Sequence, residues 1–495
     1  MEEPRIIDNR ELNIWEALIP VIALVILLAF NVFVFGDDAL SGSNQFILLI
    51  GAAVAAMVGF ANKVSYQQMM EEVAENFQSV AGAILILLMV GALAGSWLIS
   101  GIIPAMIYYG LQILHPSIFL PATVVITAII SIATGSSWTT SATVGIALIG
   151  IGQAVGIPVG MVAGAVISGA YFGDKMSPLS DTTNLAAAMA GSELFSHIRY
   201  MAFTTVPTIL LTLLLFVIIS FTQDPNGVAE TDAILAVIDQ NFQVSGWLFL
   251  VPLFVIGLIV RKTKPLIALL AGALLGAIFA IIFQPEIVKG ITGAASLSFV
   301  SAYKGVLKAM TEGHSIDAAN EAFNALIGKE ESLFSSGGMA GMLGTIWLII
   351  CAMVFGGVMD AIGALSRISK ALLSLAKSIF GLFASTVASC LALNVTASDQ
   401  YLAIVVPGKM FSKAYQDKGL APENLSRTLE DSGTVTSVLV PWNTCGAYQS
   451  GVLGVSVGEY FLFAFFNYIS PFMTLLFAAL QIKIKQIASK EELVA

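Results

Sequence analysis

Apolar runs about as long as a membrane is thick alternate with short polar segments along almost the whole chain. A helix needs roughly 20 predominantly apolar residues to cross the hydrocarbon layer, and about a dozen segments approach this length. The apolar runs cover 15–35, 46–61, 80–113, 118–134, 142–173, 201–221, 246–260, 265–283 and most of 340–483. We therefore expect an all-α polytopic membrane protein with no large soluble domain.

Two polar stretches interrupt this pattern more severely than the others. The first, 173–184, places three charges, a proline and five hydroxyl or amide side chains between apolar runs. The second, 434–446, repeats hydroxyl side chains, then Pro441, then Asn443 and Thr444. Because proline removes a backbone donor and short polar side chains compete for backbone groups, both stretches predict broken membrane helices.

The two halves of the chain share the order and spacing of their breaks. In each half a polar break precedes a break with proline, and a proline in the last helix follows: Gly135, Pro178 and Pro207, then Asn394, Pro441 and Pro471. The first two markers are 43 residues apart in one half and 47 in the other, and the next two are 29 and 30 apart. Glycine and proline are common in membrane helices. The matched order of the breaks therefore indicates a repeat only when it is combined with the charge pattern.

Basic residues mark the expected cytoplasmic side of a membrane protein. Lys63, the turn 261–264 and the C-terminal tail are basic, whereas the loop 222–243 has four acidic residues and no Lys or Arg. These charges orient the halves 1–243 and 244–495 in opposite directions, with both termini in the cytoplasm. We predict two inverted repeats with paired broken helices, the arrangement by which secondary transporters bind solutes at mid-membrane.

Four other segments complete the predicted architecture. The polar segment 63–78 is expected to form a helix at the membrane interface, and 1–11 a solvated start on the cytoplasmic surface. The mixed-charge stretch 284–338 is expected to be an extramembrane insertion on the outside. This insertion and the helices at 15–35 and 246–283 lack intramembrane charge and should form the scaffold against which the broken helices move.

Composition narrows the function further. The chain is 57% hydrophobic and 11% charged, which excludes a nucleic-acid-binding role, and its net charge of −10 is spread over loops and termini. The three cysteines are scattered in apolar runs, which favours packing over disulfides or a metal site: they are Cys351, Cys390 and Cys445. We expect no cofactor, and we assign no role to His115, His197 or His314.

Acidic residues inside the membrane are the strongest functional candidates, because an ionised Asp at the bilayer centre costs about 2.5–3.5 kcal/mol. Asp181 stands among hydroxyl and amide oxygens, which suit a dehydrated alkali cation. For Lys175, a functional role and an interfacial position at a helix end are equally compatible with the sequence. For Glu430 and Asp431, helix capping competes with a proton-relay role, which we favour slightly.

The full set of candidates lies in or beside the predicted breaks. The cation- and proton-binding candidates are Ser137, Thr139, Asp174, Ser177, Asp181, Thr183, Asn184, Asn394, Thr396, Asp399, Glu430, Asp431, Asn443 and Thr444. Of these, we expect Asp174, Asp181 and Asn184 to ligate sodium.

Three motifs together resemble the signatures of the NhaC family of bacterial sodium/proton antiporters: residues 135–140, residues 169–184, and Glu430 to Thr434 with Pro441 to Thr444. The resemblance implies an inverted-repeat carrier of the ion-transporter superfamily, located in the bacterial cell membrane. It implies exchange of sodium for protons. The family also includes exchangers that couple sodium and protons to malate and lactate, and the family resemblance alone suggests a homodimer.

Other classes of protein fit the sequence less well. A channel needs a continuous polar pore, whereas the polar residues here cluster at breaks. An intramembrane enzyme needs a nucleophile–base or metal-ligand set, and the sequence contains no His-rich or Cys-rich constellation. A carboxylate exchanger is the closest rival, since helix N-termini bind carboxylates. The absence of Arg from the apolar runs and the presence of several acids favour a cation.

The same acids suggest a mechanism. Burial and a neighbouring like charge both favour the neutral form of a carboxyl group. We therefore expect Asp174 or Asp181 to hold a proton near neutral pH, and sodium to compete with that proton for the same oxygens.

Overall fold

The computed structural model describes residues 11–35, 42–113, 116–222, 228–261, 263–327 and 333–487. In these ranges eight helices are long and apolar enough to cross a membrane, or up to ten if each of two bent pairs counts as one span. The protein is therefore an all-α polytopic membrane protein. The predicted polar start, the loop residues 36–41, His115, Lys262 and the end of the tail lie outside the described residues.

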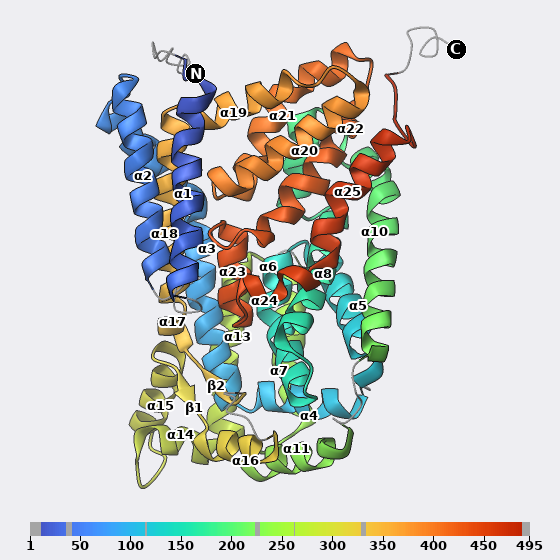
Figure 1. The fold of residues 1–495 in the computed structure, drawn as a ribbon. Coiled ribbons are helices and arrows are strands. Elements are labelled where there is room, and N and C mark those ends of the chain that lie inside the picture. The colour runs from blue at the N-terminus through green and yellow to red at the C-terminus, as the bar shows by residue number, and fades with distance from the viewer. Residues whose placement is uncertain are drawn as a thin grey trace.

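One group of helices forms a continuous bundle at the left of Figure 1. It consists of α1 (Ile14–Phe35), α2 (Ser43–Ala61), α3 (Tyr66–Ile99), α13 (Pro265–Phe283) and α18 (Leu343–Ala361). The prediction of a separate interfacial helix at 63–78 is wrong. Ser65 caps α3 through a capping box with Gln68, and the polar turns continue unbroken into the apolar part of this 34-residue helix.

The first set of broken helices follows α4 (Ile102–Ile113), which runs along the lower edge in Figure 1. α5 (Pro116–Thr134) rises to the middle of the molecule, and α6 (Ser137–Thr140), a π-helical turn (Ser141–Gly145) and α7 (Ile146–Ala154) return to the same edge. α8 (Val159–Met176) and α9 (Asp181–Ala190) are separated by the break at 177–180, and α10 (Leu194–Thr222) crosses back.

The second set has the same order of elements. α20 (Ile379–Thr396) descends from the upper edge and α21 (Gln400–Asp417) returns to it. α22 (Pro422–Leu429) continues through a π-helical turn (Glu430–Thr434) and a 3-10 turn (Ser437–Leu439) to the break at 440–443. Then come α23 (Thr444–Leu453), α24 (Val457–Tyr460), a 3-10 turn (Phe461–Phe463) and α25 (Phe465–Ala479).

The breaks match in backbone detail. We call α5–α6 the first hairpin and α20–α21 the second. In both, the second helix is preceded by a residue with left-handed backbone and then an N-cap residue. The left-handed residues are Gly135 (φ +69°) before Ser136 and Ser398 (φ +60°) before Asp399. The second breaks each place an N-cap two residues after proline, and α9 and α23 are both ten residues long. Since one hairpin enters from the lower edge and the other from the upper edge, the two sets are inverted repeats (Figure 1). The third break lies at 397–399, because Asn394 and Thr396 still belong to α20.

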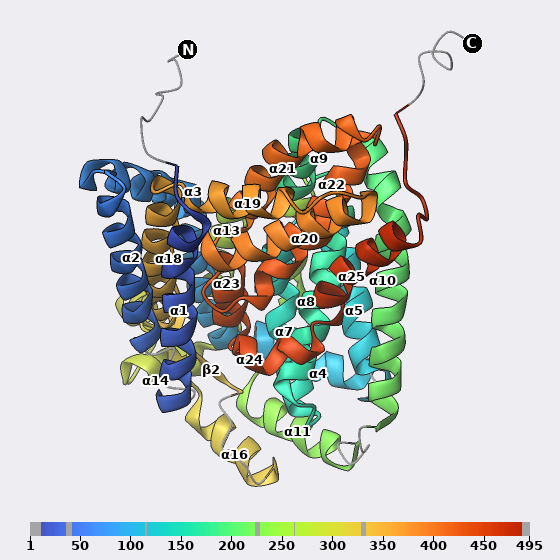
Figure 2. The same cartoon turned by 45° about the horizontal axis from the view of Figure 1, so that its top comes forward.

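The remaining elements cover the two edges. α19 (Ala364–Leu373) lies at the upper edge (Figures 1 and 2). The opposite edge holds α11 (Val228–Asn241), α14 (Pro285–Thr292), α15 (Phe299–Thr311), α16 (Asp317–Ile327), α17 (Gly338–Gly341) and the short antiparallel strands β1 (His314–Ser315) and β2 (Ser335–Ser336). The insertion predicted at 284–338 therefore forms part of a cap on the edge away from the termini. A 3-10 turn (Gly246–Phe249) and α12 (Leu250–Val260) lead from this cap toward α13.

Candidate functional site

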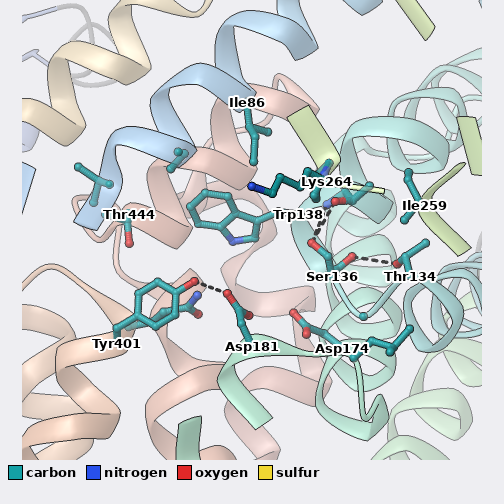
Figure 3. A pocket seen from close by; sticks show the side chains of 18 of the residues that line it. Ile86, Thr134, Ser136, Trp138, Asp174, Asp181, Ile259, Lys264, Tyr401 and Thr444 are labelled. Atoms are coloured by element: carbon teal, nitrogen blue, oxygen red, sulfur yellow. Dashed lines mark hydrogen bonds between the residues drawn. The ribbon is translucent and has the colours of Figure 1, made fainter. Parts of the chain in front are cut away.

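A cavity of 510 Å³ lies where the broken helices meet. Residues at or beside all four breaks line it, together with part of α3 and the turn between α12 and α13 (Figure 3). Its polar lining comprises Ser79, Thr134, Ser136, Thr139, Asp174, Asp181, Thr263, Lys264, Asp399, Gln400, Tyr401 and Thr444. Three carboxyl groups and one ammonium group thus share one cavity.

Asp174 is buried at the end of α8, where the first hairpin turns. Its Oδ2 accepts hydrogen bonds from the backbone N–H of Ser137 at 3.0 Å and from the Ser137 hydroxyl at 2.7 Å. The preceding Gly173 allows α8 to touch α5, since a Cβ there would lie 2.4 Å from the carbonyl oxygen of Ala128. Oδ1 of Asp174 accepts no hydrogen bond from any described residue. One carboxylate oxygen is therefore anchored, and the other remains available to a cation or a proton.

Asp181 links the two repeats across the cavity. It is the first residue of α9, and its Oδ1 accepts the backbone N–H of Thr182 at 2.9 Å. The hydroxyl of Tyr401, from the first turn of α21, donates to its Oδ2 at 2.5 Å (Figure 3). A carboxylate at a helix N-terminus is favoured by the helix dipole. Movement of one repeat against the other would break or reshape this contact.

Asp399 both caps a helix and lines the cavity. As the N-cap of α21, its Oδ1 accepts the backbone N–H groups of Tyr401 at 2.8 Å and Leu402 at 3.1 Å. The Thr444 hydroxyl lies 3.5 Å from its Oδ2. The cap uses one oxygen, and the other faces the first residue of α23.

A second polar centre lies in the core, outside the cavity lining. Lys175 is fully buried and forms an ion pair with Asp431, which also accepts hydrogen bonds from Thr204 at 2.8 Å and Thr474 at 2.5 Å. Next to this pair, Glu430 is fully buried, and neither of its carboxylate oxygens has a hydrogen-bond partner in the described ranges. Both acids lie in the π-helical turn 430–434, a distortion that is frequent at functional sites. Neither acid is the N-cap of a helix, and Lys175 lies in the core, not at an interface.

The structure does not bring all the predicted residues to the cavity. The predicted residues that line the cavity are Asp174, Asp181, Thr139, Asp399 and Thr444. Ser137 is not part of the lining, but its hydroxyl donates a hydrogen bond to Asp174. Four predicted residues lie outside the lining, because their hydroxyl or amide groups donate hydrogen bonds to nearby backbone carbonyls. They are Ser177, Thr183, Asn184 and Thr396. Asn394 and Asn443 bond to each other and hold the third and fourth breaks together.

Sequence reasoning missed the rest of the lining, of which four residues are chemically notable. Tyr401 and Gln400 follow the third break directly, and their position just after Asp399 was the available signal. Trp138 lies inside a noted motif, and its ring stacks on Tyr448 at a centroid distance of 4.0 Å. Lys264 was assigned to a cytoplasmic turn, but that turn reaches the cavity.

A buried arginine was also missed. Arg427 is fully buried in α22, with its guanidinium carbon 4.6 Å from the centre of the Tyr200 ring. Arg427 does not belong to the cavity lining, so it is not a clamp for a carboxylate substrate there.

The chemistry of the cavity suits a hard monovalent cation. Carboxylate, hydroxyl and carbonyl oxygens are the preferred ligands of such ions. No group of three or more His, Cys, Asp or Glu side chains in the described part of the chain forms a metal site. A cation bound here would therefore be ligated by one or two carboxylates together with hydroxyl and backbone oxygens. The small negative charge of such a site permits release of the ion.

Inverted repeats, four broken helices and carboxylates at their meeting point define a secondary carrier. Residues 169–482 match the model of the Na+/H+ antiporter family. The chain is 37% identical to the Na(+)/H(+) antiporter NhaC of Alkalihalophilus pseudofirmus over 88% of its length and 90% of that protein. It is 36% identical to the NhaC antiporter of Bacillus subtilis (79% and 83% covered) and 34% identical to the malate-2H(+)/Na(+)-lactate antiporter of that organism (94% of each). The chain belongs to the Na+/H+ antiporter family.

Proposed function

We propose that this protein exchanges sodium ions for protons across the cytoplasmic membrane of a bacterium. The observation that carries the proposal is the position of Asp174 and Asp181 at the crossing of the two inverted repeats. Hydrogen bonds hold both carboxylates, Asp174 through Ser137 and Asp181 through Thr182 and Tyr401, and the cavity that they line is large enough for a cation with part of its water shell. Membership of the family supports the identity of the ions.

Competition for these carboxylates provides the coupling. Two carboxylates that face one cavity repel each other, and binding of either a proton or a sodium ion relieves this repulsion. Sodium entering the cavity displaces that proton, and a proton arriving on the other side displaces sodium. Because Tyr401 bridges to Asp181 from the opposite repeat, occupancy of the site can bias the relative position of the repeats.

The charge distribution supports a cytoplasmic location for the edge that holds both termini. Elements at this edge are the α2–α3 turn, α19, the α21–α22 turn and the segment after α25 (Figure 1). They carry Lys63, Arg367, Lys370, Lys418, Lys483 and Lys485. The cap on the opposite edge carries Lys289, Lys304 and Lys308 in its described residues. This asymmetry agrees with the positive-inside rule.

A flux assay tests the proposal directly. Purified protein in proteoliposomes should take up sodium against its gradient when a pH gradient is imposed, with no organic solute present. Accumulation of sodium under these conditions, abolished by collapsing the pH gradient with an ionophore, is the expected result. A strict requirement for an added carboxylate would overturn simple sodium/proton exchange.

One observation favours a second candidate, the exchange of small carboxylates coupled to sodium and protons. The Lys264 side chain lines the cavity and lies opposite Asp174 and Asp181 (Figure 3). An ammonium group within a 510 Å³ cavity could hold a carboxylate while the acids hold the cation. Adding malate or lactate to the flux assay distinguishes the candidates, because only a carboxylate exchanger would be stimulated and would lose that stimulation in Lys264→Met.

A further inference from the structure

His197 is buried in α10 without a hydrogen-bond partner. Its side chain is 0% exposed, and neither Nδ1 nor Nε2 is bonded to any described group. Buried polar groups are almost always paired, so an unpaired imidazole in a packed core calls for an explanation. An apolar residue would fill the same space without the cost of burying two ring nitrogens.

Three charged groups lie near enough to His197 to act on its ring. Those that act on it electrostatically are Lys175 from α8, Asp431 from the π-helical turn and Glu423 from α22. Of the other helices that pack on α10, α5 and α25 carry no charged residue, and α9 carries Asp181, which lines the cavity. The charges near His197 therefore come from two directions, the upper edge and the buried ion pair.

α10 and α22 hold these groups in register. The helices run in the same direction, and Ser196 bonds to Glu423 at 2.7 Å, Tyr200 to Asn424 at 2.6 Å, and Thr204 to Asp431 at 2.8 Å. This ladder places His197 between Glu423 at the upper edge and Asp431 in the core.

Glu423 provides a carboxylate at the upper edge, held there by two side-chain hydrogen bonds. Although burial opposes its ionisation, hydrogen bonds from Lys485 at 2.5 Å and from Ser196 outweigh this effect and lower its pKa. The carboxylate is therefore charged at neutral pH.

The same series of groups continues inward to the cavity. Glu430, beside Asp431 and without partners, is acted on by Lys175, Asp174 and Asp431. Asp174 lines the cation cavity. Ionisable side chains thus follow one another from the upper edge to the cavity.

We propose that His197 is a proton relay between Glu423 and the buried Lys175–Asp431 pair, which gives protons a route through the core toward the carboxylates of the cavity. The proposal rests on the proposed sodium/proton exchange. A neutral imidazole carries one N–H and one free nitrogen, so the free nitrogen accepts a proton from one side and the other nitrogen releases its own to the opposite side. Rotation of the ring restores the starting tautomer, and one proton has moved with no net change in charge.

Comparison of two exchange modes tests this relay. Sodium/sodium exchange moves the carrier with sodium in both directions and needs no proton, whereas sodium/proton exchange needs proton delivery in each cycle. His197→Gln should slow sodium/proton exchange about a hundredfold, in the range typical of lost acid–base groups, and should leave sodium/sodium exchange within about twofold of wild type. Thr205→Val, a matched change at another buried and unpaired polar group of α10, should alter neither mode.

The outcomes separate the relay from the proposed function. If wild-type protein catalyses no sodium/proton exchange, the proposed function fails first. If wild type exchanges and His197→Gln does too, or if the variant loses both modes equally, the relay is wrong. Should His197→Gln fail to fold, Glu423→Gln supplies the same comparison from the upper edge, with selective loss of the proton-dependent mode expected and equal loss of both modes contradicting the relay.

Discussion

Replacing Asp174 with Asn removes one charge from the cavity and changes its shape very little. The amide keeps an oxygen that can accept the two hydrogen bonds from Ser137, so the junction between α8 and the first hairpin should remain closed. The bound cation loses its attraction to a full negative charge. At a separation of about 4 Å and an effective dielectric constant of about 20, this attraction is worth about 4 kcal/mol.

This free energy corresponds to about a thousandfold weaker sodium binding. Binding of radioactive sodium to purified protein measures the loss, and a flux assay in proteoliposomes measures the accompanying loss of exchange. Ser137→Ala is the matched control, because it removes one hydrogen bond to the carboxylate and keeps the charge, at a cost of about 1–3 kcal/mol in stability. Wild-type sodium affinity in Asp174→Asn would refute the assignment of this carboxylate as a cation ligand.

Three further predictions concern the surroundings of the cavity. Removing one partner of the buried pair, as in Asp431→Leu, should lower the free energy of unfolding by about 3–5 kcal/mol, and adding Lys175→Met should recover much of it, measured by thermal denaturation in detergent. Tyr401→Phe removes the hydrogen bond to Asp181 and should change sodium affinity by about 1–3 kcal/mol; unchanged binding isotherms would contradict a role for this contact. Gly135→Ala should destabilise the first hairpin by at least about 1 kcal/mol, because φ is +69° and the new Cβ would meet a side-chain carbon at 2.6 Å; equal melting temperatures would speak against this.

The positions of the breaks were predictable because prolines and clustered hydroxyls leave a clear mark in apolar sequence. Pro178 and Pro441 stand inside breaks, as expected. The third break was placed a few residues early, since Asn394 and Thr396 are polar yet remain helical by bonding to other segments or to their own helix. The third break is made by Ser398, which has a left-handed backbone and precedes the N-cap of α21. The composition of this segment does not reveal that conformation.

The site was less predictable than the fold, because tertiary packing decides which polar groups stay free. Thr183 and Asn184 have the right chemistry for a cation but bond to nearby backbone carbonyls. Tyr401 and Lys264 reach the cavity from segments distant in sequence, and only the arrangement of the repeats brings them there. The partner of Lys175, 256 residues away, could not be inferred from spacing.

The pH dependence of the apparent sodium affinity tests the central claim most directly. If sodium and protons compete for Asp174 and Asp181, the affinity measured in proteoliposomes should fall as pH drops between about 9 and 6, by up to about tenfold per pH unit where one proton is displaced. An apparent sodium affinity that stays constant across this range would contradict competition at these carboxylates.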